Sequence, residues 1–215
     1  GAPLAHNLAP AGLDTGGFDT QDVKVDLDEI LPTAKECALN SDVVITMLPN
    51  GEILKIVATQ IIEHMKNEAI FLDCSTVDVA SAKNVAELSE KYRIIPLDAP
   101  VSGGIGGATA GTLTFMVGGP LEGFNKVKNL FDIMGQKAVH CGNSGSGQSA
   151  KICNNMILGA TMIATCEAFS LADKLGLDRQ SMFDVVSTSS GYSWSMNVYC
   201  PAPGVGPVSP SDNSY

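Results

Sequence analysis

Short apolar runs rich in β-branched residues recur along the first two thirds of the chain. They predict strands at residues 42–48, 69–73, 94–98, 111–119 and 137–141. Between them, longer stretches of helical character predict helices at about 51–65, 80–92 and 124–134. Strands that alternate with helices at this spacing predict a doubly wound α/β sheet of the Rossmann type, which binds ligands at the carboxyl ends of its strands.

The pattern changes after about residue 145. Here a long apolar stretch at 149–176 predicts a helix that leaves the sheet, and a short helix is expected at 179–186, before a Pro/Gly/Ser-rich tail at 201–215. The sequence therefore predicts a sheet domain over residues 1–145 and a helical region over 146–215. Polar residues interrupt the apolar part at 152–169, which is expected to be too polar and too short to span a lipid bilayer.

The first part of the chain is less regular. Residues 1–9 have the pattern of a helix interior, with no capping residue before them. Residues 12–24 contain no apolar run, so no strand can be placed there.

Composition narrows the classes of partner. The chain has 215 residues, 45% of them hydrophobic, and a formal net charge of −10, which argues against nucleic acid or an anionic membrane as the main partner. Its six cysteines form no C-x-x-C spacing and do not cluster with the three histidines. They are expected to be reduced and mostly buried, and no metal site is expected.

One lysine stands out at the beginning of the long helix. The segment from Gly147 to Met156 places Asn155 four residues after Lys151, on the same helix face. An ammonium and a carboxamide at this spacing can hold one small oxyanion or hydroxyl between them. On spacing alone, a solvated surface charge is the simpler interpretation. The preceding Gly145 to Ala150 also matches G-x-G-x-x-A, but no βαβ unit follows it, which favours a hinge into the helix over a dinucleotide fingerprint.

A glycine-rich loop follows the strand at 94–98. Ser102, Gly103 and Gly104 are expected to connect two strands as a loop, and loops of this kind are often only flexible connections. Glycines also allow successive N–H groups to point at one anion, which suits a carboxylate. At other strand ends, Met47, Leu48 and Pro49 follow one apolar run and Thr76 follows the next.

Together these segments resemble the β-hydroxyacid dehydrogenases. The resemblance implies that Lys151 is the general acid/base, that Asn155 holds the same substrate oxygen, and that the loop at 102–104 binds the substrate carboxylate. It implies a dinucleotide-binding first domain in which Gly1 is the last glycine of a fingerprint whose first strand lies upstream. The residues implied to contact the cofactor are therefore Gly1, Met47, Leu48, Pro49 and Thr76. The helical region over 146–215 is implied by the same resemblance to be the start of an all-α second domain.

The resemblance also implies a reaction: oxidation of 3-hydroxyisobutyrate to methylmalonate semialdehyde with NAD, a step of valine breakdown. NADP stays open, because the ribose-contacting residue is not visible. Trp194 is expected either to line the substrate pocket or to anchor the core. Tyr192 stands where the resemblance leads one to expect arginine, so tartronate or succinate semialdehyde reduction stays open as well.

Partners and compartment follow only from the resemblance. It implies a small hydroxyacid as substrate, a homo-oligomer, and the mitochondrial matrix in a eukaryote or the cytoplasm otherwise. A non-catalytic family member or fragment is the alternative from another class.

Overall fold

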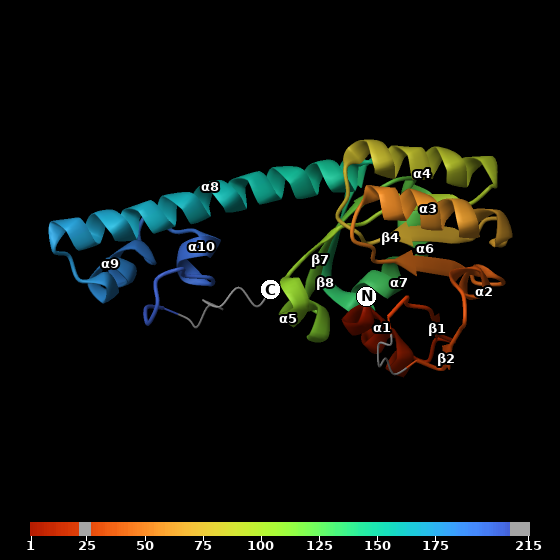
Figure 1. Ribbon diagram of the computed structural model, residues 1–215, viewed down its shortest axis with the longest axis horizontal. Helices are drawn as coiled ribbons and strands as arrows, with labels where there is room; N and C mark the ends of the chain where they lie inside the picture. Colours follow the sequence, from red (N-terminus) through yellow and green to blue (C-terminus); the bar gives the residue numbers. More distant parts are fainter. Residues whose placement is uncertain (22–26, 207–215) are drawn as a thin grey trace. The chain divides into compact units, whose positions relative to one another are not determined.

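The computed structural model describes residues 1–21 and 27–206, and the chain forms two compact units, Gly1–Lys151 and Ile152–Tyr215 (Figure 1). The elements of the first unit are α1 (Ala2–Leu8), η1 (Ala9–Ala11), β1 (Gly16–Gly17), β2 (Glu29–Ile30), α2 (Ala34–Ala38), β3 (Val43–Thr46), α3 (Gly51–Ile61), η2 (Ile62–His64), β4 (Ile70–Asp73), α4 (Val79–Lys91), β5 (Ile95–Asp98), β6 (Val101–Ser102), α5 (Gly104–Thr109), β7 (Leu113–Gly118), α6 (Leu121–Lys126), α7 (Lys128–Met134) and β8 (Gly135–Gly142). The helix α8 (Ser146–Leu175) begins in this unit.

The main sheet has six strands. Its order is β3-β4-β5-β7-β6, and β8 pairs with β7. The β3-β4, β4-β5 and β7-β8 pairs are parallel, whereas β7 runs antiparallel to both β5 and β6. The carboxyl ends of β3, β4 and β5 therefore meet at one edge, where Thr46 is in register with Asp73 and Asp73 with Asp98.

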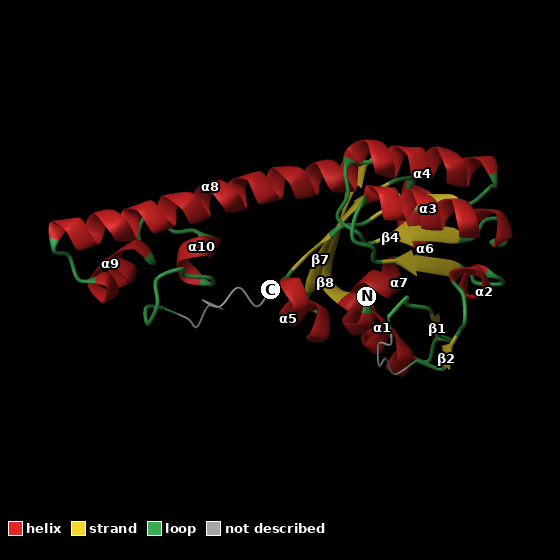
Figure 2. Ribbon diagram, viewed as in Figure 1, coloured by secondary structure: helices red, strands yellow, loops and turns green. Residues whose placement is uncertain are grey.

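Helices cover both faces of this sheet (Figures 1 and 2). Along β4 the side chains alternate, because successive strand residues point to opposite faces. Ile70 and Leu72 belong to a core cluster with α1 and α7, whereas Phe71 belongs to a second cluster with α3 and α4. Both clusters are well buried, and the result is a three-layer α/β unit with one core on each face of the sheet.

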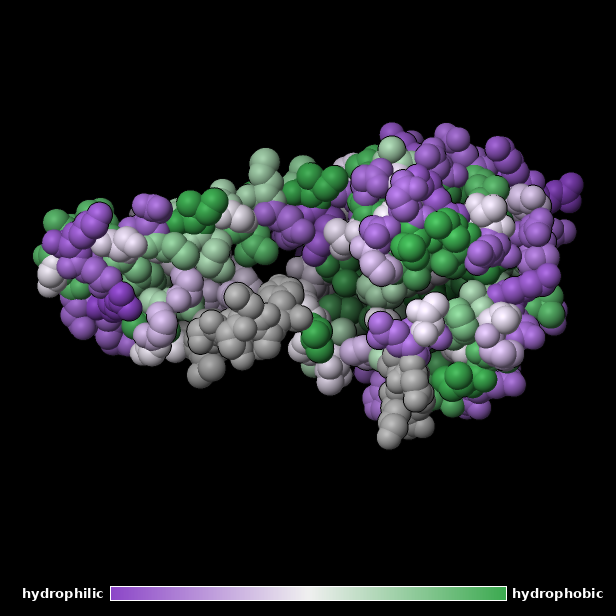
Figure 3. Space-filling model, viewed as in Figure 1, coloured by the Kyte–Doolittle hydropathy of each residue, from purple (hydrophilic) through white to green (hydrophobic). Residues whose placement is uncertain are grey.

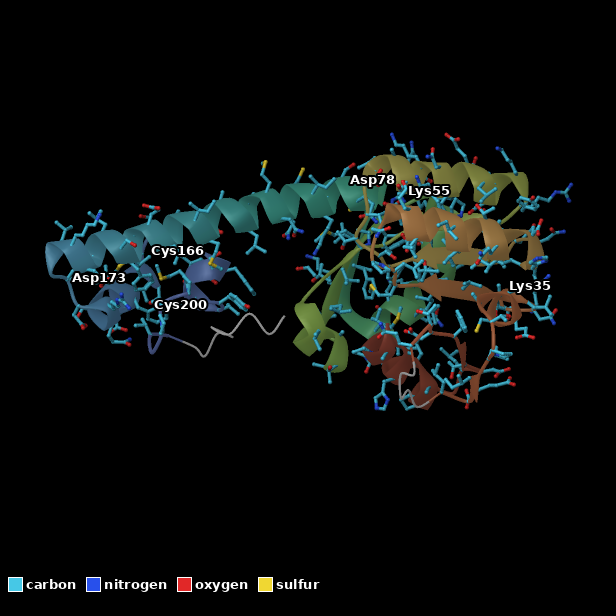
Figure 4. The ribbon with its side chains drawn as sticks, viewed as in Figure 1. Lys35, Lys55, Asp78, Cys166, Asp173 and Cys200 are labelled. Carbon is cyan, nitrogen blue, oxygen red and sulfur yellow. The ribbon has the colours of Figure 1, made fainter. Side chains whose placement is uncertain are left out.

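Side-chain caps fix where the main helices begin. Asn50 accepts a hydrogen bond from the N–H of Ile53 at the start of α3, and Asp78 accepts one from the N–H of Ser81 at the start of α4. Such caps satisfy N–H groups that have no partner within the helix. Asp78 lies near Lys55 of the neighbouring helix, and its hydrogen bonds from Ser81, with a smaller contribution from that ammonium, hold the pKa of its carboxyl low (Figure 4).

The α/β fold predicted from the sequence is confirmed, with three corrections. The expected strand at 111–119 is β7, which runs antiparallel to β5 and makes the sheet mixed. The glycine-rich connection is not a plain loop, since it contains β6 and the helix α5. The helix expected at 124–134 is two helices, α6 and α7.

At residues 12–24, where no strand could be placed, the structure has the two-residue strand β1, paired with β2. Residues 22–24 of that stretch, and residues 207–215 of the expected tail, lie outside the described residues.

The second unit contains most of α8 together with α9 (Arg179–Val186) and α10 (Trp194–Asn197). A small core joins them, and its most buried side chains are Phe169, Ala172, Met196 and Cys200. Thr161 of α8 and Ser195 of α10 share a hydrogen bond of 3.0 Å, and Arg179 forms an ion pair with Asp173. The expected helix at 179–186 is confirmed as α9.

Much of α8 carries apolar side chains on its surface (Figure 3). Ile152, Met156 and Ile163 are between 51% and 69% exposed. With 30 residues, α8 is long and apolar enough to cross a membrane by length and composition alone. The expectation that this segment is too short and too polar is therefore corrected as far as length and composition go, since the helix extends beyond the apolar run at 152–169 at both ends; one such helix does not by itself indicate a membrane span.

Candidate functional site

A buried carboxylate organises the ends of β3 and β4. Oδ1 of Asp73 accepts hydrogen bonds from Thr46 Oγ1 at 2.7 Å, from Ser75 Oγ at 2.6 Å and from the N–H of Ser75 at 3.2 Å. Ser75 Oγ in turn accepts one from the N–H of Leu48 at 2.7 Å. The turn after β3 and the turn after β4 are therefore held together by one serine and one aspartate.

The electrostatics of Asp73 are unusual. Burial raises the pKa of its carboxyl to about 6, although the hydrogen bonds from Ser75 and Thr46 oppose the rise. Its other oxygen, Oδ2, accepts no hydrogen bond from any residue that the structure describes. A buried group of this kind holds its charge weakly, because desolvation penalises the ionised form.

A second carboxylate, at the end of β5, holds the beginning of α8. Oδ1 of Asp98 accepts a hydrogen bond from the N–H of Gly145 at 2.6 Å, and Oδ2 accepts one from the N–H of Gln148 at 3.0 Å. Burial raises the pKa of Asp98, and these N–H donors oppose the rise. A carboxylate at this place satisfies N–H groups that the first helical turn leaves unpaired.

The two glycines in the segment from Gly145 to Ala150 are explained by their backbone angles and by the main chain that packs against them. A Cβ on Gly147 would clash with the carbonyl oxygens of Met116 and Asp98, and Gly145 has a positive φ of 89°. Both glycines are therefore required where α8 leaves the sheet. This packing accounts for the G-x-G-x-x-A pattern without a phosphate ligand, in agreement with the interpretation as a hinge.

The Asp98 anchor places Lys151 one turn into α8. Its Nζ donates a hydrogen bond to the carbonyl oxygen of Val101 at 2.6 Å. Val101 is the residue that precedes Ser102, so the amine lies beside the Ser102 segment. The side chain is half-buried, and this burial lowers the pKa of Lys151. A lysine with a lowered pKa is more often neutral, which a general base requires. The structure thus brings together Lys151 and the segment predicted to bind the substrate carboxylate.

Ser102 ends β6, where it pairs with Thr114, and Gly103 and Gly104 lead into α5. The two glycines have φ angles of 132° and 62° and are exposed. Positive φ values of this kind are readily available only to glycine. The first N–H groups of a helix have no partner within it, so the beginning of α5 leaves donors available for an anion. The role of this segment stays a prediction.

The residues predicted to contact the cofactor lie along the edge where β3 and β4 end. A Cβ on Gly1 would be 3.9 Å from Cβ of Met47, so the start of α1 and the turn after β3 are neighbours. Pro49 is exposed, and Thr76 is exposed between the buried residues Ser75 and Val77. This edge is where dinucleotides bind in doubly wound folds, and the contact of these residues with a cofactor stays a prediction.

Asn155 and Trp194 belong to the second unit. Asn155 lies one turn after Lys151 in α8, and its Oδ1 accepts a hydrogen bond from Asn154 Nδ2 at 3.1 Å. Trp194 is 45% exposed and stacks on Tyr199 with ring centroids 5.2 Å apart. A fully buried core anchor is therefore excluded for Trp194, and the substrate roles of both residues stay predictions.

Two family models cover nearly the whole chain. Residues 1–142 match the NAD binding domain of 6-phosphogluconate dehydrogenase, and residues 145–205 match the model described as NAD-binding of NADP-dependent 3-hydroxyisobutyrate dehydrogenase. A solved structure of 3-hydroxyisobutyrate dehydrogenase from Mycobacterium tuberculosis with L-serine is 41% identical, with a TM-score of 0.91, over 99% of this chain and 75% of that one. The chain belongs to the 3-hydroxyisobutyrate dehydrogenase family.

Other family relatives differ in their printed names. A mitochondrial 3-hydroxyisobutyrate dehydrogenase from Mus musculus is 39% identical over the full chain and 67% of that protein. An NAD-dependent L-serine dehydrogenase from Pseudomonas aeruginosa is also 39% identical, over the full chain and 75% of that protein. Membership in the 3-hydroxyisobutyrate dehydrogenase family makes this chain an oxidoreductase with an NAD-binding domain, which confirms the class of enzyme and the cofactor expected from the sequence.

Two polar residues of this edge, Asp73 and Gln148, were given no role in the sequence. Asp73 was considered only as the end of an apolar run, and Gln148 only as part of the segment from Gly145 to Ala150. A signal for Asp73 existed, because an aspartate that ends a buried strand in a doubly wound sheet lies at the ligand edge. No comparable signal existed for Gln148, whose side-chain partners lie more than 70 residues away.

Proposed function

We propose that this protein oxidises 3-hydroxyisobutyrate to methylmalonate semialdehyde. NAD+, when bound, accepts the hydride from the carbinol carbon. The observation that carries the proposal is the placement of Lys151. Its half-buried amine has a lowered pKa and lies 2.6 Å from the carbonyl oxygen of Val101, the residue that precedes the Ser102 to Gly104 segment.

In this proposal Lys151 takes the hydroxyl proton of the substrate. Neutral lysine can accept it through Nζ, while the Val101 carbonyl keeps the amine oriented. The free amine has a pKa of about 10.4, and the lowered pKa of Lys151 increases the neutral fraction at physiological pH. In the reverse direction the ammonium returns the proton to the aldehyde oxygen.

The carboxylate of the substrate is proposed to bind at Ser102, Gly103 and Gly104. Their exposed backbone and the hydroxyl of Ser102 supply neutral donors, which hold an anion without adding a competing base. Asn155 is proposed to hold the substrate oxygen that Lys151 deprotonates, and Trp194 to wall the substrate. Fixing the carboxylate and the hydroxyl together aligns the carbinol carbon for hydride transfer.

Cofactor contacts are assigned in the same proposal to Gly1, Met47, Leu48, Pro49 and Thr76. The Asp73 and Ser75 hydrogen bonds hold the two turns that carry most of these residues. We place the dinucleotide-binding domain at residues 1–145 and the substrate and oligomerisation region at 146–215. NAD is the expected cofactor, and NADP is tested beside it.

The test is reduction of NAD+ and NADP+ by purified protein with 3-hydroxyisobutyrate, run beside Lys151→Ala. Turnover is expected with 3-hydroxyisobutyrate, and the variant is expected to lose about 100-fold or more in kcat, as is typical when a general base is removed. Fast turnover in the variant would contradict the role of Lys151. No turnover of any hydroxyacid would favour a non-catalytic member of the family.

L-Serine is the second candidate substrate. A similar solved structure contains L-serine, and one relative is named an L-serine dehydrogenase. Like 3-hydroxyisobutyrate, L-serine carries a carboxylate and a hydroxyl on the β carbon, so the same residues would bind both. Comparison of kcat/KM for L-serine, glycerate, 4-hydroxybutyrate and 3-hydroxyisobutyrate separates the candidates, because glycerate and 4-hydroxybutyrate are the hydroxyacids that tartronate and succinate semialdehyde reductases form.

The assembly state is part of the proposal. We infer that the exposed apolar side chains of α8, among them Ile152, Met156 and Ile163, are covered by a second subunit, because exposed apolar patches of this kind mark interaction surfaces. A homo-oligomer also accounts for the high hydropathy of α8 without a bilayer. For the compartment, we propose the mitochondrial matrix in a eukaryotic source and the cytoplasm otherwise.

A further inference from the structure

Gln148 is the most completely enclosed polar side chain at the start of α8. Its exposed fraction is 0%, and both ends of its amide are used. Nε2 donates a hydrogen bond to the carbonyl oxygen of Ser75 at 2.8 Å, and Oε1 accepts one from the N–H of Val77 at 3.1 Å. The amide therefore binds the peptide groups on both sides of Thr76 and leaves Thr76 itself exposed.

The main chain of Gln148 is fixed as well. Its N–H donates to Oδ2 of Asp98, the last residue of β5. One residue thus connects the start of α8 to the ends of both β4 and β5. The side chain of Ser75, whose carbonyl Gln148 contacts, belongs to the Asp73 network that also holds Leu48.

Lys151 follows Gln148 by three residues, which is nearly one turn of helix. Any shift or rotation of α8 that moved the amine of Lys151 would also pull the Gln148 amide away from the turn that carries Thr76. The two places that the proposed reaction uses, the cofactor turn and the base, are therefore joined through a single buried side chain.

We propose that Gln148 is a positioning residue that sets the place of Thr76 at the cofactor relative to the amine of Lys151. This inference rests on the proposed function, in which Thr76 contacts NAD+ and Lys151 removes the proton. Gln148 does not touch the reacting atoms, and its effect passes through the Thr76 turn and through α8.

Only an amide meets both hydrogen-bonding requirements at every pH. A carboxylate of the same shape could still accept from the N–H of Val77, but it would face the carbonyl of Ser75 with a second acceptor. When protonated, the same carboxyl regains a donor and can restore both bonds. Gln148→Glu therefore makes the positioning dependent on pH, which simple loss of packing would not.

The experiment measures the Kd of NAD+ by titration calorimetry for the wild type and Gln148→Glu at pH 6 and pH 8.5, without substrate. At pH 8.5 the variant is expected to bind about 10-fold or more weakly, the size of one lost hydrogen bond to a buried group. At pH 6 the ratio of the two constants is expected to fall to within about threefold, since complete burial disfavours the ionised form and keeps the introduced carboxyl protonated.

Taking the ratio to wild type removes the titration of the neighbouring Asp73, Asp98 and Lys151. Gln60→Glu is the matched control, because it adds the same charge at an exposed position of α3. The control is expected to bind as the wild type does at both pH values. If Gln148→Glu does not fold at pH 8.5, Gln148→Met, which cannot ionise, replaces it and is expected to bind weakly at both pH values.

Wild-type affinity in either Gln148 variant at pH 8.5 overturns the inference, as does an equal loss in Gln148→Glu at both pH values. A wild type that binds NAD+ but oxidises no hydroxyacid refutes the proposed reaction only, and the binding ratio still decides the role of Gln148.

Discussion

Replacing Asp73 by asparagine tests the electrostatics at the ligand edge. The substitution keeps an oxygen that can accept from Thr46 and Ser75, and it removes the ability to ionise. Asp73 is 3% exposed, and burial raises the pKa of its carboxyl to about 6 from an ordinary value of 3.8. The folded protein therefore binds this proton more tightly than the unfolded chain does.

The sign and size follow from that difference. Protonated Asp73 contributes its full stability below pH 3.8, and the contribution is lost as pH rises through about 6. At 1.36 kcal/mol for each pH unit between the two pKa values, the free energy of unfolding falls by about 3 kcal/mol across this range. Asparagine stays neutral, so Asp73→Asn escapes the loss. Its amide nitrogen, placed where Oδ2 lacks a partner among the described residues, adds a pH-independent penalty of about 1 kcal/mol.

Urea denaturation followed by circular dichroism at several pH values from 4 to 8 measures the effect. The stability of Asp73→Asn minus that of the wild type is expected to rise by about 3 kcal/mol over this range. Asp132→Asn, at an exposed position of α7, controls for the loss of one negative charge. A difference for Asp73→Asn that stays flat with pH would refute the reasoning, since it would mean that Asp73 titrates alike in the folded and unfolded chains.

Three further predictions concern other parts of the molecule. Lys151→Arg keeps the positive charge, but arginine cannot lose its proton near neutral pH. The kcat for 3-hydroxyisobutyrate oxidation, measured from NADH absorbance, is therefore expected to fall by about 100-fold or more at pH 8. Activity within about threefold of wild type would exclude Lys151 as the base. Gly147→Ala is expected to lower the free energy of unfolding, measured by thermal unfolding, by about 1 to 3 kcal/mol, because its Cβ would clash with two carbonyl oxygens. Gly159→Ala is the control and should lack this loss, because the space around Gly159 is open. Ile163→Glu is expected to shift the protein to smaller species in sedimentation velocity, because a charge would stand in the apolar surface of α8; an unchanged distribution would place the subunit contact elsewhere.

Sequence patterns predicted the elements whose side chains alternate or repeat regularly. The runs that became β3, β4 and β5 are apolar because both faces of these strands are covered by helices. Lys151 and the Ser102 segment could be named from their resemblance to a family, and the structure brings them to one place.

Other features could not be predicted, because they depend on contacts between distant residues. The helix α5 contains three glycines in six residues, a composition that disfavours helices, and it forms within the connection from β6 to β7. The antiparallel direction of β7 relative to β5 could not be predicted from the connection at 99–112, since a connection of about a dozen residues also allows a parallel crossover. Gln148 and Ser75 make their decisive contacts across 73 residues, which no local pattern records.

The exposure of α8 has a consequence for local unfolding. From Ser149 to Ala164, a stretch that the structure describes fully, every residue is exposed or half-buried, whereas Gln148 before it and Thr165 after it are buried. Because none of these side chains is buried, tertiary packing gives their backbone amides little protection against local opening. The rate of hydrogen exchange at each of these amides therefore reports whether another protein surface covers the helix at that residue. This measurement needs no activity assay.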